Sequence, residues 1–291
     1  MSEIQPASRG LGAVPLIGAL LEPPPVVAVL RLSGVIGSIG AFRRGLSLSG
    51  QADAIERAFK LRNLQAVALA VNSPGGSPVQ SSLIAGHIRQ LAEEKQVPVV
   101  AFCEDVAASG GYWLACAADE IYADASSIIG SIGVVSGGFG LQGLIEKLGV
   151  ERRLHTAGEK KAMLDPFQPE KPADVKHLKD IQGDIHLAFK DMVRARRGKR
   201  LKGAEKELFS GAFWAGAKAL ELGLVDGLGD IRSVMRERFG EDVKLKVVGE
   251  RRGWLRRLRF GATSEVPAGA DWAGQLVAAV EERLTWSRFG L

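Results

Sequence analysis

The sequence has few of the side chains that bind metals or build disulfide frameworks. Among its 291 residues there are two cysteines, Cys103 and Cys116, and four histidines. Two cysteines are too few for the disulfide framework of a small secreted protein, and no CxxC pair or Cys/His cluster indicates a metal site. We therefore expect a reduced compartment, no metal and no cofactor.

Long apolar runs and an export signal are also missing. The apolar stretch at residues 12–21 ends in EPPP and is far shorter than the roughly 20 residues that a membrane-spanning helix needs. The N-terminus does not have the Lys/Arg-led pattern of a signal peptide. These absences predict a cytoplasmic protein without a transmembrane anchor.

Positive charge is concentrated in one short segment. The net charge is +5, and residues 251–260, RRGWLRRLRF, contain five arginines and no acidic residue. The rest of the chain is therefore close to neutral, which disfavours a nucleic-acid-binding protein. Arginines interleaved with Trp and Leu indicate one of two things, a solvated basic linker or a peripheral contact with an anionic membrane, here the inner membrane.

Apolar runs alternate with helical periodicity from residue 26 onward. Residues 26–37, 64–73 and 97–104 are apolar runs typical of buried strands, and residues 81–95 have the spacing of a helix. A strand, a helix and a strand with short connections predict a parallel crossover, so the fold class is α/β. Further strands are expected at residues 120–127 and 151–157, and further helices at residues 111–118, 141–150, 172–198 and 213–226.

The apolar stripe of the long predicted helix 172–198 consists of Val175, Leu178, Ile181, Ile185 and Phe189. The chain divides by composition into an irregular leader at 1–24, one domain at 25–248, and a tail at 249–291. The tail combines the basic linker with a last amphipathic helix.

Two glycine-rich joints between a strand and a helix carry the chemical signal. Ser109 stands before Gly110 in VAASGGYW, and the pair Gly75–Gly76 belongs to VNSPGGSP. A serine before a helix is most often an N-cap. Two such joints on neighbouring parallel strands, however, would line a hole with main-chain donors, as acyl transfer needs for an oxyanion.

The sequence offers no clear base for a serine nucleophile, which needs a neighbour to take its proton. His87, His155, His177 and His186 form no recognisable Ser-His-Asp arrangement. Lys160 and Lys161 in TAGEKKAMLDPF are the remaining candidates. Spacing alone favours two solvated lysines, although burial would make either one a base.

Five motifs in order resemble the signal peptide peptidase A (SppA/SohB-type) family of Ser–Lys peptidases, peptidase family S49. They are VNSPGG, DVAASGGYWLACAADEIYAD, SIIGSIGVV, TAGEKKAMLDPF and FWAGAKALELGLVDGLG, and the resemblance spans residues 26 to 240. The resemblance implies a Clp protease/crotonase-like superhelix of β-β-α units. It also implies a short, single-repeat form without the usual membrane anchor.

The resemblance also implies roles for individual residues. Ser109 matches the nucleophile, Lys161 the general base and Ser131, in GSIG, a hydroxyl that orients the lysine. Gly110 and the Gly75–Gly76 pair match the oxyanion donors. The residue before the family's lysine is often aromatic but is Lys160 here, so a one-residue shift would make Lys160 the base.

The family implies a serine endopeptidase acting on peptides, namely remnant signal peptides or unfolded and membrane-derived polypeptides. Short family members assemble as homo-oligomeric rings, in which neighbouring subunits complete the active sites. Two alternatives remain open. One is a crotonase-like acyl-CoA enzyme, which uses the same kind of oxyanion hole without a serine nucleophile. The other is a catalytically inactive scaffold at the membrane.

Overall fold

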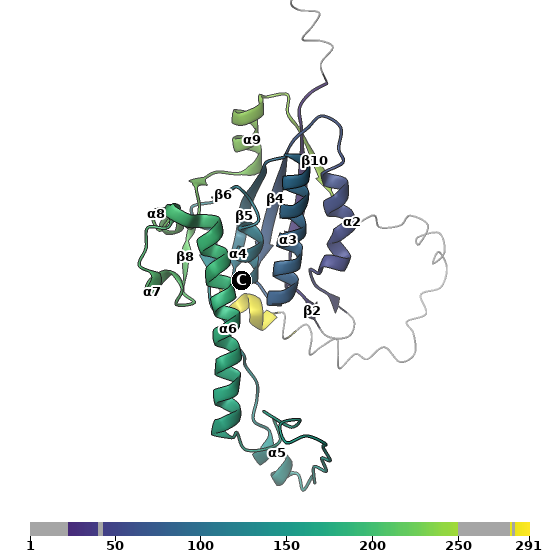
Figure 1. The fold of residues 1–291 in the computed structure, drawn as a ribbon, viewed down its shortest axis with the longest axis vertical. Helices are drawn as coiled ribbons and strands as arrows, with labels where there is room; N and C mark the ends of the chain where they lie inside the picture. Colours follow the sequence, from purple (N-terminus) through teal and green to yellow (C-terminus); the bar gives the residue numbers. More distant parts are fainter. Residues whose placement is uncertain (1–22, 40–42, 250–279, 281–282) are drawn as a thin grey trace, which may run out of the picture.

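The fold is a parallel β-sheet with helices on both faces (Figure 1). The structure is a computed structural model that describes residues 23–39, 43–249, 280 and 283–291. Residues 1–22 of the predicted leader at 1–24, the basic segment 251–260 and most of the last amphipathic helix therefore lie outside the described residues. The strands are β1 (Val26–Ser33), β2 (Ser38–Ile39), β3 (Arg43–Arg44), β4 (Leu64–Ser73), β5 (Val99–Ala108), β6 (Glu120–Ala123), β7 (Ile128–Gly130), β8 (Phe213–Ala215), β9 (Gly227–Leu228) and β10 (Lys244–Val248). The helices are α2 (Leu48–Ala58), α3 (Pro78–Lys95), α4 (Gly110–Ala115), α5 (Gln142–Lys147), α6 (Pro172–Arg197), α7 (Glu205–Leu208), α8 (Gly216–Glu221) and α9 (Ile231–Phe239), with a 3₁₀ turn at Gly198–Arg200.

The main sheet runs in the order β10-β1-β4-β5-β6-β9, and all of these pairs are parallel. The predicted α/β class is confirmed, because apolar runs buried on both faces are what a covered parallel sheet requires. The last residues of β5, which follow the part that pairs with β6, pair with β7. Strand β8 pairs with β7 in the antiparallel direction. The carboxyl ends of β4, β5 and β7 thus meet at one edge.

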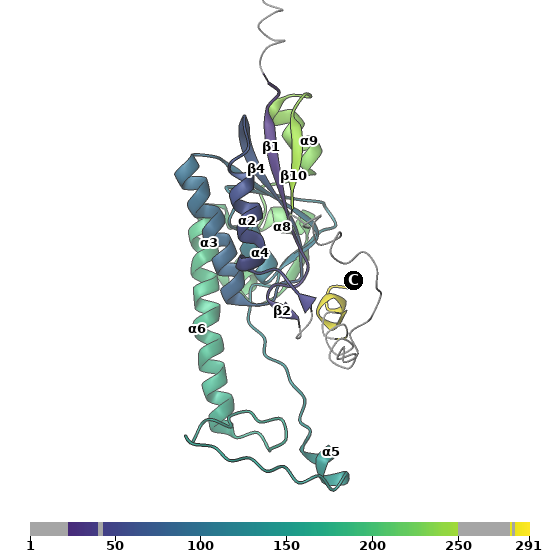
Figure 2. The same ribbon diagram turned by 90° about the vertical axis from the view of Figure 1, so that its right-hand side faces the viewer.

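The two faces of the sheet are covered differently. Side chains of β1, β4 and β5 that point to one face pack under α2, α3, α4 and α6, and those on the other face pack under α9, as Figure 2 shows edge-on. Close to the end of β5, Phe289 from the last residues of the chain packs on Val106 and Ala108.

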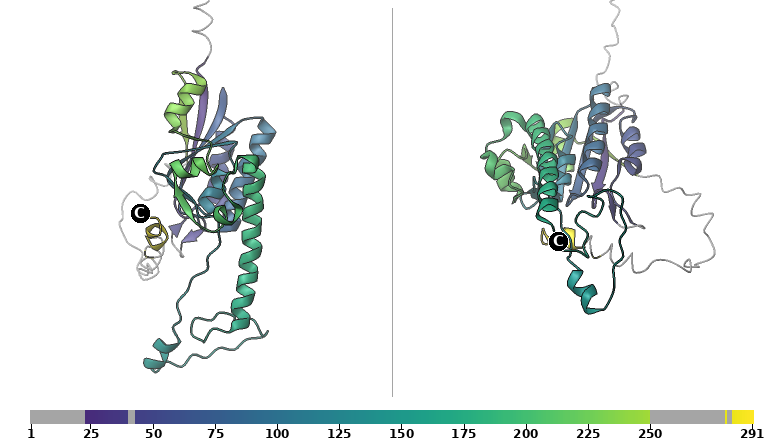
Figure 3. Two further views of the ribbon diagram at one scale, coloured as in Figure 1. Left: turned by 90° about the vertical axis from the view of Figure 1, so that its left-hand side faces the viewer. Right: turned by 60° about the horizontal axis from the view of Figure 1, so that its bottom comes forward.

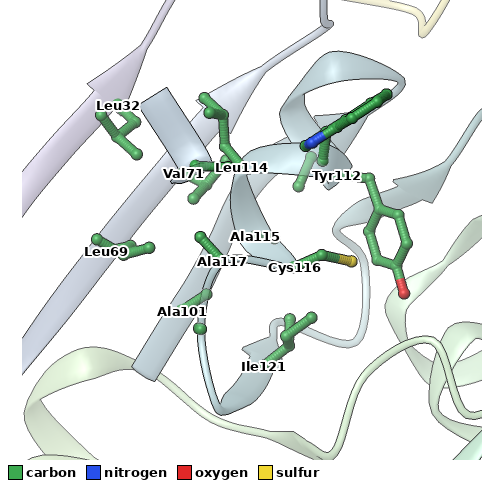
Figure 4. Packing of buried hydrophobic residues seen from close by; sticks show 14 of the residues in the cluster. Leu32, Leu69, Val71, Ala101, Tyr112, Leu114, Ala115, Cys116, Ala117 and Ile121 are labelled. Atoms are coloured by element: carbon green, nitrogen blue, oxygen red, sulfur yellow. The ribbon is translucent and has the colours of Figure 1, made fainter. Parts of the chain in front are cut away.

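Helix α4 is held deep in the core (Figure 4). Its residues Tyr112 and Leu114 are fully buried, and the Tyr112 hydroxyl donates to the Leu224 carbonyl at 2.7 Å. Burial raises the pKa of Tyr112 well above its ordinary value and that of Cys116 to about 11, so these groups stay neutral and serve packing. The start of α4 is consequently fixed.

An arm formed by residues 134–171 projects from the body alongside the first half of α6 (Figure 3). Six large apolar side chains of the arm are exposed: Val135, Phe139, Leu144, Leu148, Val150 and Leu154. Internal contacts shape the arm, including an ion pair of 2.9 Å between Arg152 and Asp165. Exposed apolar side chains on one segment, not covered by the other described residues, are typical of an interaction surface.

One expectation fails in this arm. The strand predicted at 151–157 is absent, because residues 151–156 have no neighbouring chain to form a ladder with. The stripe predicted on α6 is covered unevenly: Phe189 is buried, Ile185 is half-buried and Ile181 is 40% exposed. The periodicity identified the helix correctly, but it could not show that half of the helix extends past the sheet.

Candidate active site

Ser109 lies at the start of α4 but does not cap it. It occupies the N-cap position with φ 53° and ψ −122°, and its side chain makes no capping hydrogen bond. A positive φ costs a residue with a Cβ on the order of 1–3 kcal/mol, and such strain concentrates at functional sites. The commonest interpretation of a serine before a helix, that of a cap, does not hold here.

The Ser109 backbone is held in this conformation by the neighbouring strand. Its N–H donates to the Gly130 carbonyl at 2.8 Å, and its own carbonyl accepts from Trp113 N–H at 3.0 Å. Within the described part of the chain, the Ser109 hydroxyl has no hydrogen-bond partner. The hydroxyl is thus available for chemistry at a half-buried position.

The Gly75–Gly76 turn lies directly against Ser109. A Cβ added to Gly75, whose φ is 103°, would lie 2.7 Å from the Ser109 Cβ and 2.8 Å from Gly110 N. Only glycine permits this approach of two backbones. The two glycine-rich joints predicted from the sequence are therefore side by side.

Two main-chain N–H groups at this contact are unpaired among the residues that the structure covers, those of Gly76 and Gly110. The turn is hydrogen-bonded to Ile36 by two other groups: the Gly75 carbonyl accepts from the Ile36 N–H, and the Ser77 N–H donates to the Ile36 carbonyl, each at 2.8 Å. The Gly76 N–H makes neither bond. Gly76 N lies 3.4 Å from the position of a Cβ on Gly110. The Gly75 N–H, by contrast, already donates to Ser73 Oγ at 3.2 Å.

Ser131 follows β7 on the strand next to Ser109. It is 6% exposed, has a φ of 52°, and donates its N–H to the Ala212 carbonyl at 2.7 Å. Since Ala108 and Gly130 are paired in register, the two serines follow neighbouring strand ends. The structure therefore brings Ser109, Ser131 and the glycine pair to one edge of the sheet.

Lys160 and Lys161 are not part of this group in the single chain. Both are exposed and lie in a turn of the projecting arm, and the arm stands apart from α4, which Ser109 precedes (Figure 1). A lysine that acts as a general base needs burial, because burial favours its neutral form. The site of one chain, as it stands, contains a serine and donors but no base among the described residues.

A small pocket adjoins Ser109, and sequence reasoning did not find its walls. It is lined by Gly76, Pro78, Ser109, Gly110, Trp113, Gly133, Val134, Ile185 and Phe189. The Trp113 and Phe189 rings stack with centroids 4.8 Å apart. The stripe of α6 contained the signal for Ile185 and Phe189, but nothing in the sequence placed that helix beside α4.

The end of α6 is anchored to the body by arginines. Arg196 donates to the Cys116 and Ala118 carbonyls at the end of α4, at 2.9 and 2.8 Å. Arg197, only 2% exposed, is paired with Asp226 at 2.6 Å. Burial alone would raise the pKa of Asp226, but hydrogen bonds from Arg197 and the Ile121 N–H outweigh it and lower that pKa.

None of the four histidines bonds to Ser109. The His186 ring lies near the segment after Ser131, since its Nε2 is 3.2 Å from the Ile132 carbonyl.

In the part of the chain that the structure describes, none of the helices has both the length and the apolar character needed to cross a membrane.

Comparison with known proteins finds peptidases. The model of a family described as peptidase family S49 matches residues 91–246. A candidate protease of Synechocystis sp. is 32% identical over 256 residues, which cover 85% of this chain and 89% of that protein. A solved structure, a mutant of the 1510-N membrane-bound stomatin-specific protease in complex with a substrate peptide, aligns over 88% of this chain and 98% of that chain, with a TM-score of 0.47 and 13% identity.

A protein of Brucella abortus named Na(+)/H(+) antiporter NhaA is 49% identical over 272 residues, 91% of this chain. The chain spans only 37% of the length of that relative. The similarity therefore concerns a part of a longer protein.

Proposed function

The chain belongs to peptidase family S49, and on that premise we propose that it is a serine endopeptidase with Ser109 as nucleophile and Lys161 as general base. The family also confirms the Clp protease/crotonase-like α/β class expected from the motifs. One observation carries the proposal. Ser109 is held in a strained conformation, with an unbonded hydroxyl, beside two N–H groups that are unpaired among the described residues.

The proposed reaction follows from these positions. Neutral Lys161 takes the Ser109 proton while the serine oxygen attacks a peptide carbonyl. The carbonyl oxygen becomes an oxyanion, which the Gly76 and Gly110 N–H groups stabilise. The lysine then gives its proton to the leaving amine, and water hydrolyses the acyl ester. Gly75 shapes the turn instead of donating, because its N–H is already bonded to Ser73.

Ser131 is proposed to orient the lysine. Its buried position beside Ser109 would let its hydroxyl accept a hydrogen bond from the lysine amine and so fix the direction of proton transfer. Ser131→Ala would then lower kcat more than it changes KM.

We propose that the lysine reaches Ser109 from a neighbouring copy of the chain in a homo-oligomeric ring. Lys161 lies on the arm, which stands apart from α4, the helix that Ser109 precedes, and the arm carries six exposed apolar side chains. Packing the arm against another copy would bury these side chains. It would also remove water from the lysine, which a base of this type requires.

Mixing two inactive variants tests this arrangement. Ser109→Ala and Lys161→Ala should each lose at least about 10³-fold in peptidase activity, whereas the matched control Lys160→Ala keeps it. Equal amounts of the two variants, assembled together, should regain up to about a quarter of wild-type activity. Each site needs an intact Ser109 from one chain and an intact Lys161 from its neighbour, and half of the chains supply each. No recovery places both residues in one chain. Full activity of Ser109→Ala overturns the proposed function.

The proposed substrates are remnant signal peptides or other unfolded polypeptides. An extended polypeptide presents accessible peptide carbonyls to Ser109, whereas in a folded protein most of these carbonyls are hydrogen-bonded and buried. A crotonase-like acyl-CoA reaction uses no serine nucleophile and would therefore not explain the strained backbone at Ser109. The predicted contact of segment 251–260 with an anionic inner membrane concerns residues outside those described and stays a prediction, as does the cytoplasmic location.

A further inference from the structure

The pocket beside Ser109 is small and has apolar side chains among its walls. Its volume is about 20 Å³, which is little more than the roughly 10–15 Å³ that one water molecule needs. Apart from backbone and the Ser109 side chain, its lining consists of apolar groups. A group of about the size of one methyl therefore fits without displacing a wall.

The position of the pocket determines which part of a substrate enters it. Ser109, Gly76 and Gly110 are among its lining residues, and the proposed function places the scissile carbonyl between them. The side chain bonded to the carbon next to that carbonyl is the one on the acyl side of the cleaved bond. This side chain lies closest to the reacting atoms, so it is the occupant of the pocket.

The walls are held firmly. Trp113 is 8% and Phe189 3% exposed, and their rings are nearly parallel, at 24°. Widening the pocket would require α4 to separate from α6, against the bonds from Arg196 to the Cys116 and Ala118 carbonyls. Close-packed interiors of this kind resist small displacements.

We propose that the stacked pair Trp113–Phe189, together with Ile185, restricts this peptidase to cleavage after small residues, alanine above all. The proposal rests on the function proposed above and adds its substrate class. Leucine and phenylalanine would need several methylene volumes that the pocket does not have. An unaccommodated methylene changes kcat/KM by about 10–200-fold, so discrimination against leucine should be at least about 100-fold.

Peptides that differ only in the residue before the cleaved bond, Gly, Ala, Leu or Phe, provide the test with the full-length wild-type protein. Cleavage after Ala should exceed cleavage after Leu by at least about 100-fold in kcat/KM. Cleavage after Leu at a rate equal to that after Ala overturns the proposal while leaving the peptidase function intact. If no peptide is cleaved, or Ser109→Ala cleaves equally well, it is the proposed function that fails.

Variants of α6 locate the restriction. Ile185 is half-buried and lines the pocket, so Ile185→Ala should fold normally and raise the Leu-to-Ala ratio of kcat/KM at least about tenfold. Ile181→Ala, one turn earlier and 40% exposed, is the matched control and should leave the ratio unchanged. Trp113→Leu should shift the ratio in the same direction. Unchanged ratios in both Ile185→Ala and Trp113→Leu would refute the role of this pocket.

Discussion

Replacing Gly75 by alanine should disable the site by geometry alone, without touching a proposed catalytic group. The new Cβ would lie 2.7 Å from the Ser109 Cβ, 2.8 Å from Gly110 N and 2.9 Å from the Ala108 carbonyl oxygen. These neighbours are backbone or the nucleophile itself, so relief requires the two turns to move apart. The left-handed backbone at Gly75, with φ 103°, adds about 1–2 kcal/mol of strain for any residue with a Cβ.

The expected loss of activity can be estimated from the displacement. Ordinary carbon contacts begin near 3.4 Å, so the turns must separate by somewhat less than about 1 Å, and misplacement of about 1 Å costs about 10²-fold in rate. Overpacking and strain together should lower the free energy of unfolding by about 2–5 kcal/mol. We expect kcat/KM for an unfolded polypeptide to fall by at least about 100-fold in protein that is still folded.

Gly86→Ala is the matched control for this change. Gly86 lies in α3, and an added Cβ there would meet nothing within 4 Å. Alanine should therefore stabilise the helix by about 0.5–1 kcal/mol and leave activity unchanged. Folded Gly75→Ala with activity close to that of the wild type would refute the view that the glycine turn and Ser109 form one site.

Two further predictions concern stability. Ser109→Gly should have a free energy of unfolding about 1–2 kcal/mol higher than that of Ser109→Ala in urea titrations, because glycine adopts a positive φ without strain. Equal free energies of unfolding would mean that the backbone at this position is not strained. Asp226→Asn leaves Arg197 buried without its counter-charge and should lose about 3–5 kcal/mol at pH 7. The pKa of Asp226 is lowered in the folded state, so the stability due to its charge is present above the unfolded pKa of about 3.9 and lost as pH falls through the folded pKa. Urea titrations should show the wild type approaching Asp226→Asn below about pH 4, and a difference that stays constant as the pH falls further would contradict this.

The buried strands and helices of the body were predictable because their signals are local. The apolar runs at β4 and β5 and the periodicity of α3 lie within single elements, and the predicted boundaries agree within a few residues. The short pairings of β7 with β8, and of β10 with β1, depend on contacts between distant segments. Strands as short as β7, β8 and β10 contain too little sequence pattern for these pairings to be predicted.

The site divides in the same way. Ser109 and the glycine pair follow the ends of predicted parallel strands, whose carboxyl ends lie together, so their proximity follows from the fold class. Ser131 follows β7, a three-residue strand that the sequence analysis did not predict. The pocket walls come from α4 and α6, and only tertiary packing stacks Trp113 on Phe189. Lys161 lies in an arm with exposed apolar side chains, and in the proposed ring its position relative to Ser109 depends on a neighbouring copy, which the sequence of one chain does not describe.

The most direct test of the central claim is the mass of the protein after reaction with an ester substrate that acylates quickly and deacylates slowly. The account predicts one acyl group per active chain, located on the peptide that contains Ser109 and absent from Ser109→Ala. An acyl group on another residue, or continued turnover by Ser109→Ala at the wild-type rate, would contradict it.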